Sequence, residues 1–269
     1  MRATGLRLSV TLLTVIPWRR PGEDTATAPT RATAAAAMAW APAVGLLLGV
    51  IASAVLLAAD HPLGAGPLTA AGLAVGSLAL LTRGLHLDGL ADLADGLASG
   101  KPAPAALDIM RRSDIGPLGT VTLILTLLIQ VAALSQAESA GHGRGPAALI
   151  AAVVTGRLAL TWACRRGVPA ARPDGLGALV AGSVRPAIPA AVTAVALAAA
   201  AGAVVISAAA GGTLGWTLPL AVAAGLAAAS AVRRHAVRRL GGITGDVLGA
   251  LAEIAATVTL VVAAMGPAA

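Results

Sequence analysis

Three aspartates lie within eight residues of one another in a chain that has only twelve acidic residues among 269. They are Asp88, Asp92 and Asp95, in the segment Arg-Gly-Leu-His-Leu-Asp-Gly-Leu-Ala-Asp-Leu-Ala-Asp-Gly that covers 83–96. In an α-helix, spacings of three and four residues place side chains on one face, so the three carboxylates are expected to lie together. A divalent cation would relieve their mutual repulsion, and hard oxygen ligands favour Mg²⁺ or Mn²⁺. The segment therefore predicts metal-assisted chemistry on a charged substrate.

The alternative is an acidic helix face that is simply solvated at the membrane surface. Four leucines lie largely opposite the carboxylates and make the segment amphipathic: Leu87, Leu90, Leu93 and Leu97. Negative side chains gain nothing from anionic lipids, and the segment has no lysine to pair with them at helical spacing. These two facts favour the metal site.

Two basic clusters beside the acidic segment are candidates for binding phosphate. Arg83 and His86 precede the first aspartate of the segment. A continuous helix would point them away from the acidic face unless Gly84 or Gly89 interrupts the helix. His86 is about equally well explained as a structural residue, and Arg83 as the positive end of a membrane span. Downstream, the segment Met-Arg-Arg-Ser-Asp-Ile-Gly-Pro-Leu-Gly (110–119) contains two arginines that could bind phosphate in a bidentate manner, or could be ordinary juxtamembrane arginines.

A third polar element stands near the carboxyl end, at 238–253. Asp246 and Glu253 are seven residues apart and so share a helix face, while the glycines of Gly-Gly-Ile-Thr-Gly (241–245) permit close backbone approach. Glu253 is expected about two turns inside the last membrane span, where an unpaired carboxylate is costly and is a functional candidate. Arg157, in an earlier span, is either its partner or a snorkelling arginine.

The elements that must position these groups are membrane helices. Apolar residues make up 57% of the chain, charged residues 12%, and the mean hydropathy is +0.85, outside the usual range of soluble proteins. Small residues suit close helix packing in lipid. The predicted fold is one all-α polytopic domain over 1–269, with about seven spans and a range of six to eight, plus short interfacial helices. The spans are expected at 34–59, 67–82, 116–134, 147–164, 187–209, 215–232 and 247–265.

The distribution of charge predicts the orientation of this bundle. The segments 1–33, 83–115, 165–186 and 233–246 carry 17 of the 19 Lys and Arg residues, which indicates a cytoplasmic amino terminus and an external carboxyl terminus in the cell membrane. Ten of the twelve acidic residues fall on the same side, and only Asp60 and Glu138 lie outside. This one-sided placement favours an active site that faces the cytoplasm.

Topology also explains the net charge of +7, so no nucleic-acid partner is expected. The single cysteine, Cys164, excludes an intrachain disulfide and argues against a cysteine-based metal cluster. The apolar run Leu8–Ile16 is too short to span the bilayer, and we interpret it as a short interfacial or partly buried helix.

Taken together, these elements resemble the membrane-bound cobalamin synthase family, the adenosylcobinamide-GDP ribazoletransferases. The resemblance covers nearly the whole chain and rests on Leu-Leu-Thr-Val-Ile-Pro (12–17), the acidic segment, Ile-Met-Arg-Arg-Ser-Asp-Ile-Gly (109–116), Gly-Leu-Gly (175–177) and Gly-Gly-Ile-Thr-Gly-Asp-Val-Leu-Gly-Ala (241–250). Many relatives resemble Met-Arg-Asp-Ser-Arg where this chain has Met-Arg-Arg-Ser-Asp. Acid and base are exchanged across Ser113, which puts the roles of Arg112 and Asp114 in doubt.

The resemblance implies transfer of adenosylcobinamide phosphate from adenosylcobinamide-GDP to α-ribazole or its 5′-phosphate, with release of GMP and assistance from Mg²⁺. The expected metal ligands are Asp88, Asp92, Asp95 and Asp246, the candidate general bases are Asp95, Asp246 and Glu253, and the substrate-binding residues are Arg83, His86, Arg111, Arg112 and Asp114. The expected partners are these small molecules and membrane lipid, and the oligomeric state cannot be read from the sequence.

Two other functions compete with this one. Asp92-Leu-Ala-Asp95-Gly96 matches the opening of the pattern of the CDP-alcohol phosphotransferases of lipid synthesis, but the following Leu-Ala-Ser-Gly lacks its Ala-Arg. A membrane transporter is less favoured because it would place its coupling groups near the bilayer midplane, whereas these acids cluster in connections between spans.

Overall fold

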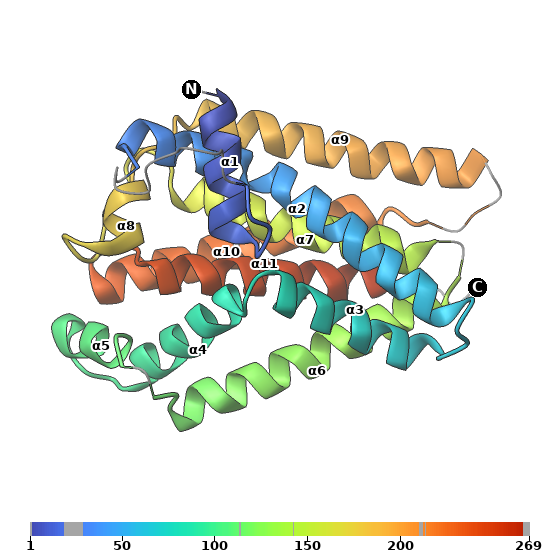
Figure 1. Ribbon diagram of the computed structural model, residues 1–269, viewed down its shortest axis with the longest axis horizontal. Coiled ribbons are helices and arrows are strands. Elements are labelled where there is room, and N and C mark those ends of the chain that lie inside the picture. Colours follow the sequence, from blue (N-terminus) through green and yellow to red (C-terminus); the bar gives the residue numbers. More distant parts are fainter. Residues whose placement is uncertain are drawn as a thin grey trace.

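The computed structural model describes residues 2–18, 29–112, 114–141, 143–209, 212 and 214–265, and within them the chain forms eleven helices and two isolated β-bridges (Figure 1). The helices are α1 (Arg2–Leu13), α2 (Arg31–Asp60), α3 (Pro67–Leu81), α4 (Leu85–Ala98), α5 (Ala103–Ile109), α6 (Pro117–Ser139), α7 (Arg144–Ala163), α8 (Gly175–Val180), α9 (Ala187–Ala209), α10 (Thr217–Leu240) and α11 (Gly245–Ala264). Each of the seven predicted apolar segments is a helix, and the expected all-α bundle is confirmed.

Local sequence signals set the ends of these helices. Thr30 and Thr244 are the N-caps of α2 and α11, and each hydroxyl accepts a hydrogen bond from a backbone N–H three residues on, at 3.2 Å. Proline occupies the first turn of α3 and of α6, where its missing N–H costs nothing. Gly241 ends α10 in the left-handed conformation with a φ of 84°.

Within the described residues, five helices are long and apolar enough to cross a membrane: α2, α6, α7, α9 and α11. The pair α3 and α4 also qualifies when taken together, but it bends by 88° at its break, which gives at most six spans. Six is the lower end of the predicted range. Two expected spans do not qualify alone, because α3 has only 15 residues, about 22 Å of helix, and α10 ends in a run of arginines.

The outermost helices present apolar side chains outward, as a lipid environment requires. Only 11% of the span window of α9 and 22% of that of α6 is buried inside the bundle. Exposed apolar residues follow both helices: Leu118, Val121, Ile124, Leu125, Leu128, Ile129, Val195, Val205 and Ile206. Such a large apolar surface indicates an integral membrane protein.

Helix α11 lies in the middle of the bundle and packs against α4, α6, α7 and α10 (Figure 1). Helix α1 packs on α2 and buries Val10 and Leu13, which confirms the predicted partly buried amino-terminal helix. Between α3 and α4 the chain turns through two left-handed residues, Arg83 with a φ of 56° and Gly84 with a φ of 66°. This turn directs the amphipathic α4 away from the axis of α3, and α4, with 14 residues, is too short to cross a membrane by itself.

Candidate active site

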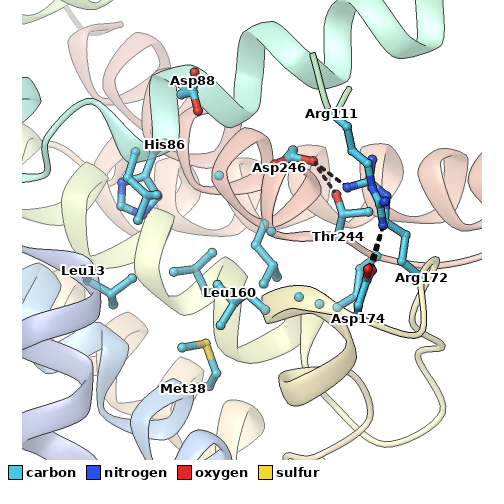
Figure 2. Close-up of a pocket in the computed structure, with 18 residues that line it drawn as sticks. Leu13, Met38, His86, Asp88, Arg111, Leu160, Arg172, Asp174, Thr244 and Asp246 are labelled. Atoms are coloured by element: carbon cyan, nitrogen blue, oxygen red, sulfur yellow. Dashed lines mark hydrogen bonds and ion pairs between the residues drawn. The ribbon is translucent and has the colours of Figure 1, made fainter. Parts of the chain in front are cut away.

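A cavity of about 430 Å³ opens at one end of the bundle, where α1, α2, α4, α7, α8 and α11 meet (Figure 2). Its floor is apolar and includes Leu13, Met38 and Leu160. Its polar side chains are His86, Asp88, Arg111, Arg172, Asp174, Thr244 and Asp246. A concave site with an aliphatic floor and a few convergent charged groups is typical of a small-molecule site. Its volume suits a nucleotide-sized group.

Two glycines bring the acidic helix α4 against the start of α11. A Cβ added at Gly89 would lie 2.7 Å from the carbonyl oxygen of Asp246, and one added at Gly249 would lie 3.1 Å from the Cα of His86. The first distance is too short for a real side chain and the second is tight enough to require a small shift, so glycine at both positions lets the helices cross this closely. The crossing places Asp246 opposite the acidic face of α4.

The loop before α8 docks on the loop before α11 in the same way. A Cβ on Gly242 would lie 2.4 Å from the backbone of Ala170, and one on Gly177 would lie 2.6 Å from the carbonyl oxygen of Ile243. Two backbone hydrogen bonds of 3.0 Å join these loops, from Ala171 N to Ile243 O and from Ile243 N to Pro169 O. The sequence predicted that Gly242 permits close approach to an anion or a neighbouring helix, and in the structure its partner is the backbone of a neighbouring loop.

Asp246 is held by groups from two elements. The hydroxyl of Thr244 donates a hydrogen bond of 3.2 Å to its Oδ2, and the guanidinium of Arg172 lies 3.8 Å from the same oxygen (Figure 2). Arg172 also donates a hydrogen bond to the carbonyl oxygen of Leu107. No other described side chain donates a hydrogen bond to this carboxylate, which lines the cavity and can be reached by a bound molecule.

A second ion pair stands at the mouth of the cavity. Arg111 donates two hydrogen bonds to the carboxylate of Asp174, at 2.8 and 3.0 Å. Both side chains are more than half exposed, so the pair contributes little to stability and its arginine can exchange the carboxylate for a phosphate. The predicted substrate-binding residue Arg111 thus lies at the cavity.

Asp92 lies one turn beyond Asp88 on α4. Partial burial, and then the negative charges of Asp88, Asp246 and Asp95, raise the pKa of Asp92 to about 7, whereas Arg172 opposes the shift. Burial is the largest cause of this shift, and the neighbouring carboxylates add to it. Asp92 does not itself line the cavity, and the carboxylate oxygens of Asp88 and Asp92 are of the kind that a hard divalent cation prefers.

Asp95 has a different environment from the other two aspartates of its segment. Its carboxylate accepts hydrogen bonds from the backbone N–H groups of Gly116, at 2.7 Å, and Gly119, at 2.9 Å, and it does not line the cavity. It thereby satisfies two of the unpaired donors at the amino end of α6 and complements the helix dipole. The glycines leave the room for it, since a Cβ on either would lie 2.4 Å from a carboxylate oxygen.

We expect Asp95→Ala to lower the stability of the fold by about 1–2 kcal/mol, the cost of losing a helix cap. Thermal unfolding of the detergent-solubilised chain would measure the loss, with the exposed Asp108→Ala on α5 as the matched control. An Asp95→Ala protein with unchanged thermal stability and abolished turnover would instead support the predicted catalytic or metal-binding role.

His86 is buried, with 2% of its surface exposed, and it lines the cavity although helical periodicity predicted the opposite face. The left-handed Gly84 interrupts the helix between α3 and α4. As a result His86 packs against Gly249 of α11 although it does not share the acidic face of α4. Burial lowers the pKa of His86, and the nearby Arg157 lowers it further, so the ring is neutral at pH 7. Neither ring nitrogen has a hydrogen-bond partner among the described residues, which leaves one donor and one acceptor for a bound molecule.

Glu253 lies in a second, much smaller cavity of about 30 Å³, seven residues further along α11 than Asp246 and thus about 10 Å deeper. Gln130 donates a hydrogen bond of 2.9 Å to its carboxylate. The predicted partner Arg157 lines the same small cavity, without a direct ion pair between the two in the described structure. Glu253 is therefore separated from the polar groups of the larger cavity.

Three predicted substrate-binding residues do not line the cavity: Arg83, Arg112 and Asp114. Arg83 is exposed and its guanidinium lies 3.5 Å from the carbonyl oxygen of Thr11. Arg112 and Asp114 are also exposed and form no ion pair with each other, and Ser113 between them lies outside the described residues.

Sequence reasoning missed Arg172 and Asp174, which it counted only as part of a basic connection. The signal was present in Arg-Pro-Asp (172–174), a turn with charges of both signs directly before Gly-Leu-Gly (175–177). Thr244 was likewise overlooked between the glycines of its motif.

Comparison with known proteins agrees with this geometry. The family model for cobalamin-5-phosphate synthase matches residues 5–264. An adenosylcobinamide-GDP ribazoletransferase of Frankia casuarinae is 46% identical over 96% of this chain and 94% of its own length. The proteins of the same name from a Nocardioides species and from Bradyrhizobium diazoefficiens are 39% and 40% identical, over 94% and 96% of this chain and 95% and 92% of their own lengths. No solved structure matches.

The family model matches nearly the whole chain, the relatives align over most of both chains, and the structure is a bundle of apolar helices. The chain belongs to the cobalamin-5-phosphate synthase family, the membrane-bound transferases of cobalamin biosynthesis.

Proposed function

We propose that the chain transfers adenosylcobinamide phosphate from adenosylcobinamide-GDP to the ribose 3′-hydroxyl of α-ribazole or α-ribazole 5′-phosphate. The observation that supports this most directly is the cavity, in which two arginines and three aspartates on different elements surround a space of nucleotide size. Guanidinium groups suit the diphosphate, and the aliphatic floor suits a flat base in a chain that has no Phe or Tyr. The larger corrin ring then lies at the mouth.

We further propose that Asp88 and Asp92 hold Mg²⁺. They stand one turn apart on α4, and burial together with the nearby charges of Asp88, Asp246 and Asp95 raises the pKa of Asp92, so a cation there would relieve the repulsion. When bound, Mg²⁺ would neutralise charge on the diphosphate and on the departing phosphate. Asp95 does not belong to this set, because both of its oxygens are engaged at the start of α6.

The residues of the chain have separable roles in this reaction. Arg111 exchanges Asp174 for the diphosphate at the mouth, and Arg172 stays in place between Asp246 and the carbonyl oxygen of Leu107. His86 is neutral and has no hydrogen-bond partner among the described residues. At the apolar end of the cavity it donates one hydrogen bond to the substrate or accepts one from it. These contacts orient the hydroxyl nucleophile against the phosphorus.

Among the three candidate general bases, the geometry favours Asp246. Asp95 is committed to the backbone of α6 and Glu253 lies in a separate cavity, whereas the carboxylate of Asp246 lines the larger cavity. In the proposed step the ribazole 3′-oxygen bonds to the phosphorus of the cobinamide phosphate, and its proton passes to Asp246. The bond from that phosphorus to the bridging oxygen breaks, and GMP leaves with the bond's electron pair.

The proposed orientation places the cavity at the cytoplasmic face of the cell membrane. The cavity lies at the end of the bundle where the arginine-rich segments meet, as the positive-inside rule requires for a cytoplasmic face. Lipid acyl chains are the expected partners of the apolar faces of α6 and α9.

A single assay separates the proposed reaction from its competitors. Purified protein in detergent or nanodiscs is incubated with Mg²⁺ and either adenosylcobinamide-GDP plus α-ribazole or CDP-diacylglycerol plus an alcohol, and the released nucleotide is quantified. We expect GMP from the first mixture, in an amount equal to the cobalamin formed, and no CMP from the second. Release of CMP would assign the chain to lipid synthesis, and release of neither nucleotide would favour a transporter.

A further inference from the structure

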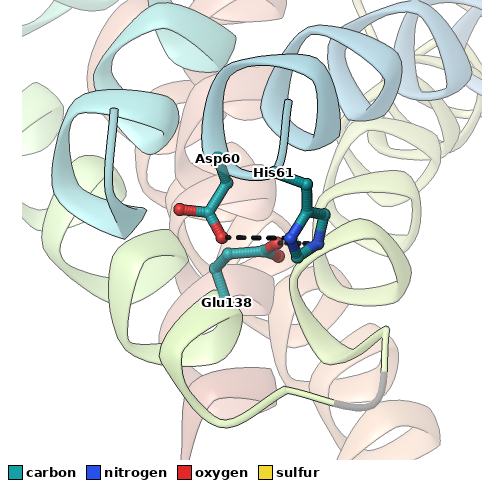
Figure 3. A group of neighbouring side chains, drawn as sticks. All are labelled: Asp60, His61 and Glu138. Atoms are coloured by element: carbon teal, nitrogen blue, oxygen red, sulfur yellow. Dashed lines mark ion pairs between the residues drawn. The ribbon is translucent and has the colours of Figure 1, made fainter. Parts of the chain in front are cut away.

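The two acidic residues that topology places away from the cavity, Asp60 and Glu138, lie next to each other and to His61 (Figure 3). Asp60 ends α2, His61 is its C-cap residue, and Glu138 lies in the last turn of α6. They stand at the opposite end of the bundle from the cavity, because Asp60 lies 22 residues beyond the cavity residue Met38 along α2, a rise of about 33 Å.

We propose that Asp60, His61 and Glu138 form a binding site for a divalent transition metal of the Zn²⁺ type. One ligand atom from each residue lies within 4.8 Å of the other two. The imidazole faces both carboxylates, with Nδ1 3.9 Å from Asp60 Oδ2 and Nε2 3.9 Å from Glu138 Oε1. An imidazole with two carboxylates suits Zn²⁺ and its neighbours in the first transition row better than Mg²⁺.

The buried state of Glu138 is the second observation that supports a metal. Only 6% of its side chain is exposed, yet no hydrogen bond to its carboxylate is formed within the described part of the chain. Gly145 provides the space for this carboxylate, since a Cβ there would lie 1.9 Å from Oε2. A buried carboxylate beside a second carboxylate needs a positive partner, and the imidazole at 3.9 Å is beyond hydrogen-bonding distance.

The geometry requires only a small adjustment to bind the ion. Metal–ligand distances of about 2.0–2.2 Å place tetrahedral ligand atoms about 3.3 Å apart, so ligand atoms that now lie within 4.8 Å of one another must close by up to about 1.5 Å. His61 can make this movement because its side chain is 69% exposed and follows the end of α2. The bound ion would tie the end of α2 directly to the end of α6, two helices that otherwise pack through α3 and α7.

Zinc binding to the purified full-length chain in detergent tests the proposal. The protein is dialysed against ZnCl₂ with millimolar MgCl₂, which occupies the carboxylate site of the cavity, and bound zinc is measured by mass spectrometry. We expect one Zn²⁺ per chain, lost in His61→Ala and retained in His235→Ala, which removes an exposed histidine of α10. Zinc should also raise the thermal unfolding temperature of the parent chain and not that of His61→Ala.

Either of two results overturns the proposal: equal zinc content in the parent and in His61→Ala, or zinc that raises the unfolding temperature of both equally. Glu138→Gln extends the test, because it keeps the volume of the side chain and should lose the ion if Glu138 is a ligand. Transferase activity of His61→Ala without zinc should equal that of the parent, since the site is remote from the cavity.

Discussion

Replacing Asp246 by Asn is expected to reduce the turnover number for GMP release by about 100- to 10,000-fold, the contribution of a general base. The amide keeps the shape of the side chain and can still accept the hydrogen bond of Thr244, so the fold and the position of α11 should persist. Only the ability to take the proton of the ribazole hydroxyl is lost. Single-turnover measurement of GMP at saturating Mg²⁺ and substrate would show the loss.

The dependence of the rate on Mg²⁺ distinguishes a base from a metal ligand. We assign Asp88 to the metal, so Asp88→Asn should raise the Mg²⁺ concentration for half-maximal activity about 10-fold or more, whereas Asp246→Asn should leave that concentration unchanged. Asp108→Asn, an exposed acid on α5 outside the cavity, is the matched control and should retain the parental rate. If Asp246→Asn instead raises the Mg²⁺ requirement and recovers at high Mg²⁺, Asp246 is a metal ligand and not the base.

Composition and periodicity predict the bundle because each segment that crosses lipid must satisfy its own backbone hydrogen bonds. Every backbone polar group in the membrane must be paired within its own helix, so long apolar runs report helices and arginine positions report their ends. The seven expected segments accordingly appear as α2, α3, α6, α7, α9, α10 and α11. What the pattern does not report is the bend after α3, which depends on two successive left-handed residues, Arg83 and Gly84.

The site was harder to predict, because spacing within one helix says which side chains share a face and not what that face meets. Asp88, Asp92 and Asp95 were expected to share one environment, but the third lies a turn further along α4, where α6 begins. There Gly116 and Gly119, at the end of the segment expected to bind phosphate, bind the protein's own carboxylate. The start of a helix flanked by glycines can bind either a substrate phosphate or a carboxylate of the protein. The packing of α4 on α6 determines that it binds the carboxylate of Asp95.

The close crossing of α4 and α11 makes a second prediction with a large effect. Gly89→Ala would bring a methyl group to 2.7 Å from the carbonyl oxygen of Asp246, a backbone atom that cannot turn aside. The two helices must then separate by about 1 Å, and a displacement of that size at reacting groups costs about 100-fold in rate. We expect Gly89→Ala to lose that much activity while it still inserts in the membrane.

A graded series of glycine substitutions separates this displacement from a general loss of stability. Gly249→Ala meets the backbone of His86 at 3.1 Å, a smaller overlap, and should lose less activity than Gly89→Ala. Gly76→Ala in α3 meets open space and should keep full activity, with a gain of about 0.5–1 kcal/mol in helix stability. Parental activity in Gly89→Ala would contradict the assignment of catalysis to groups on both helices, because carboxylates that tolerate a shift of α4 against α11 do not act together.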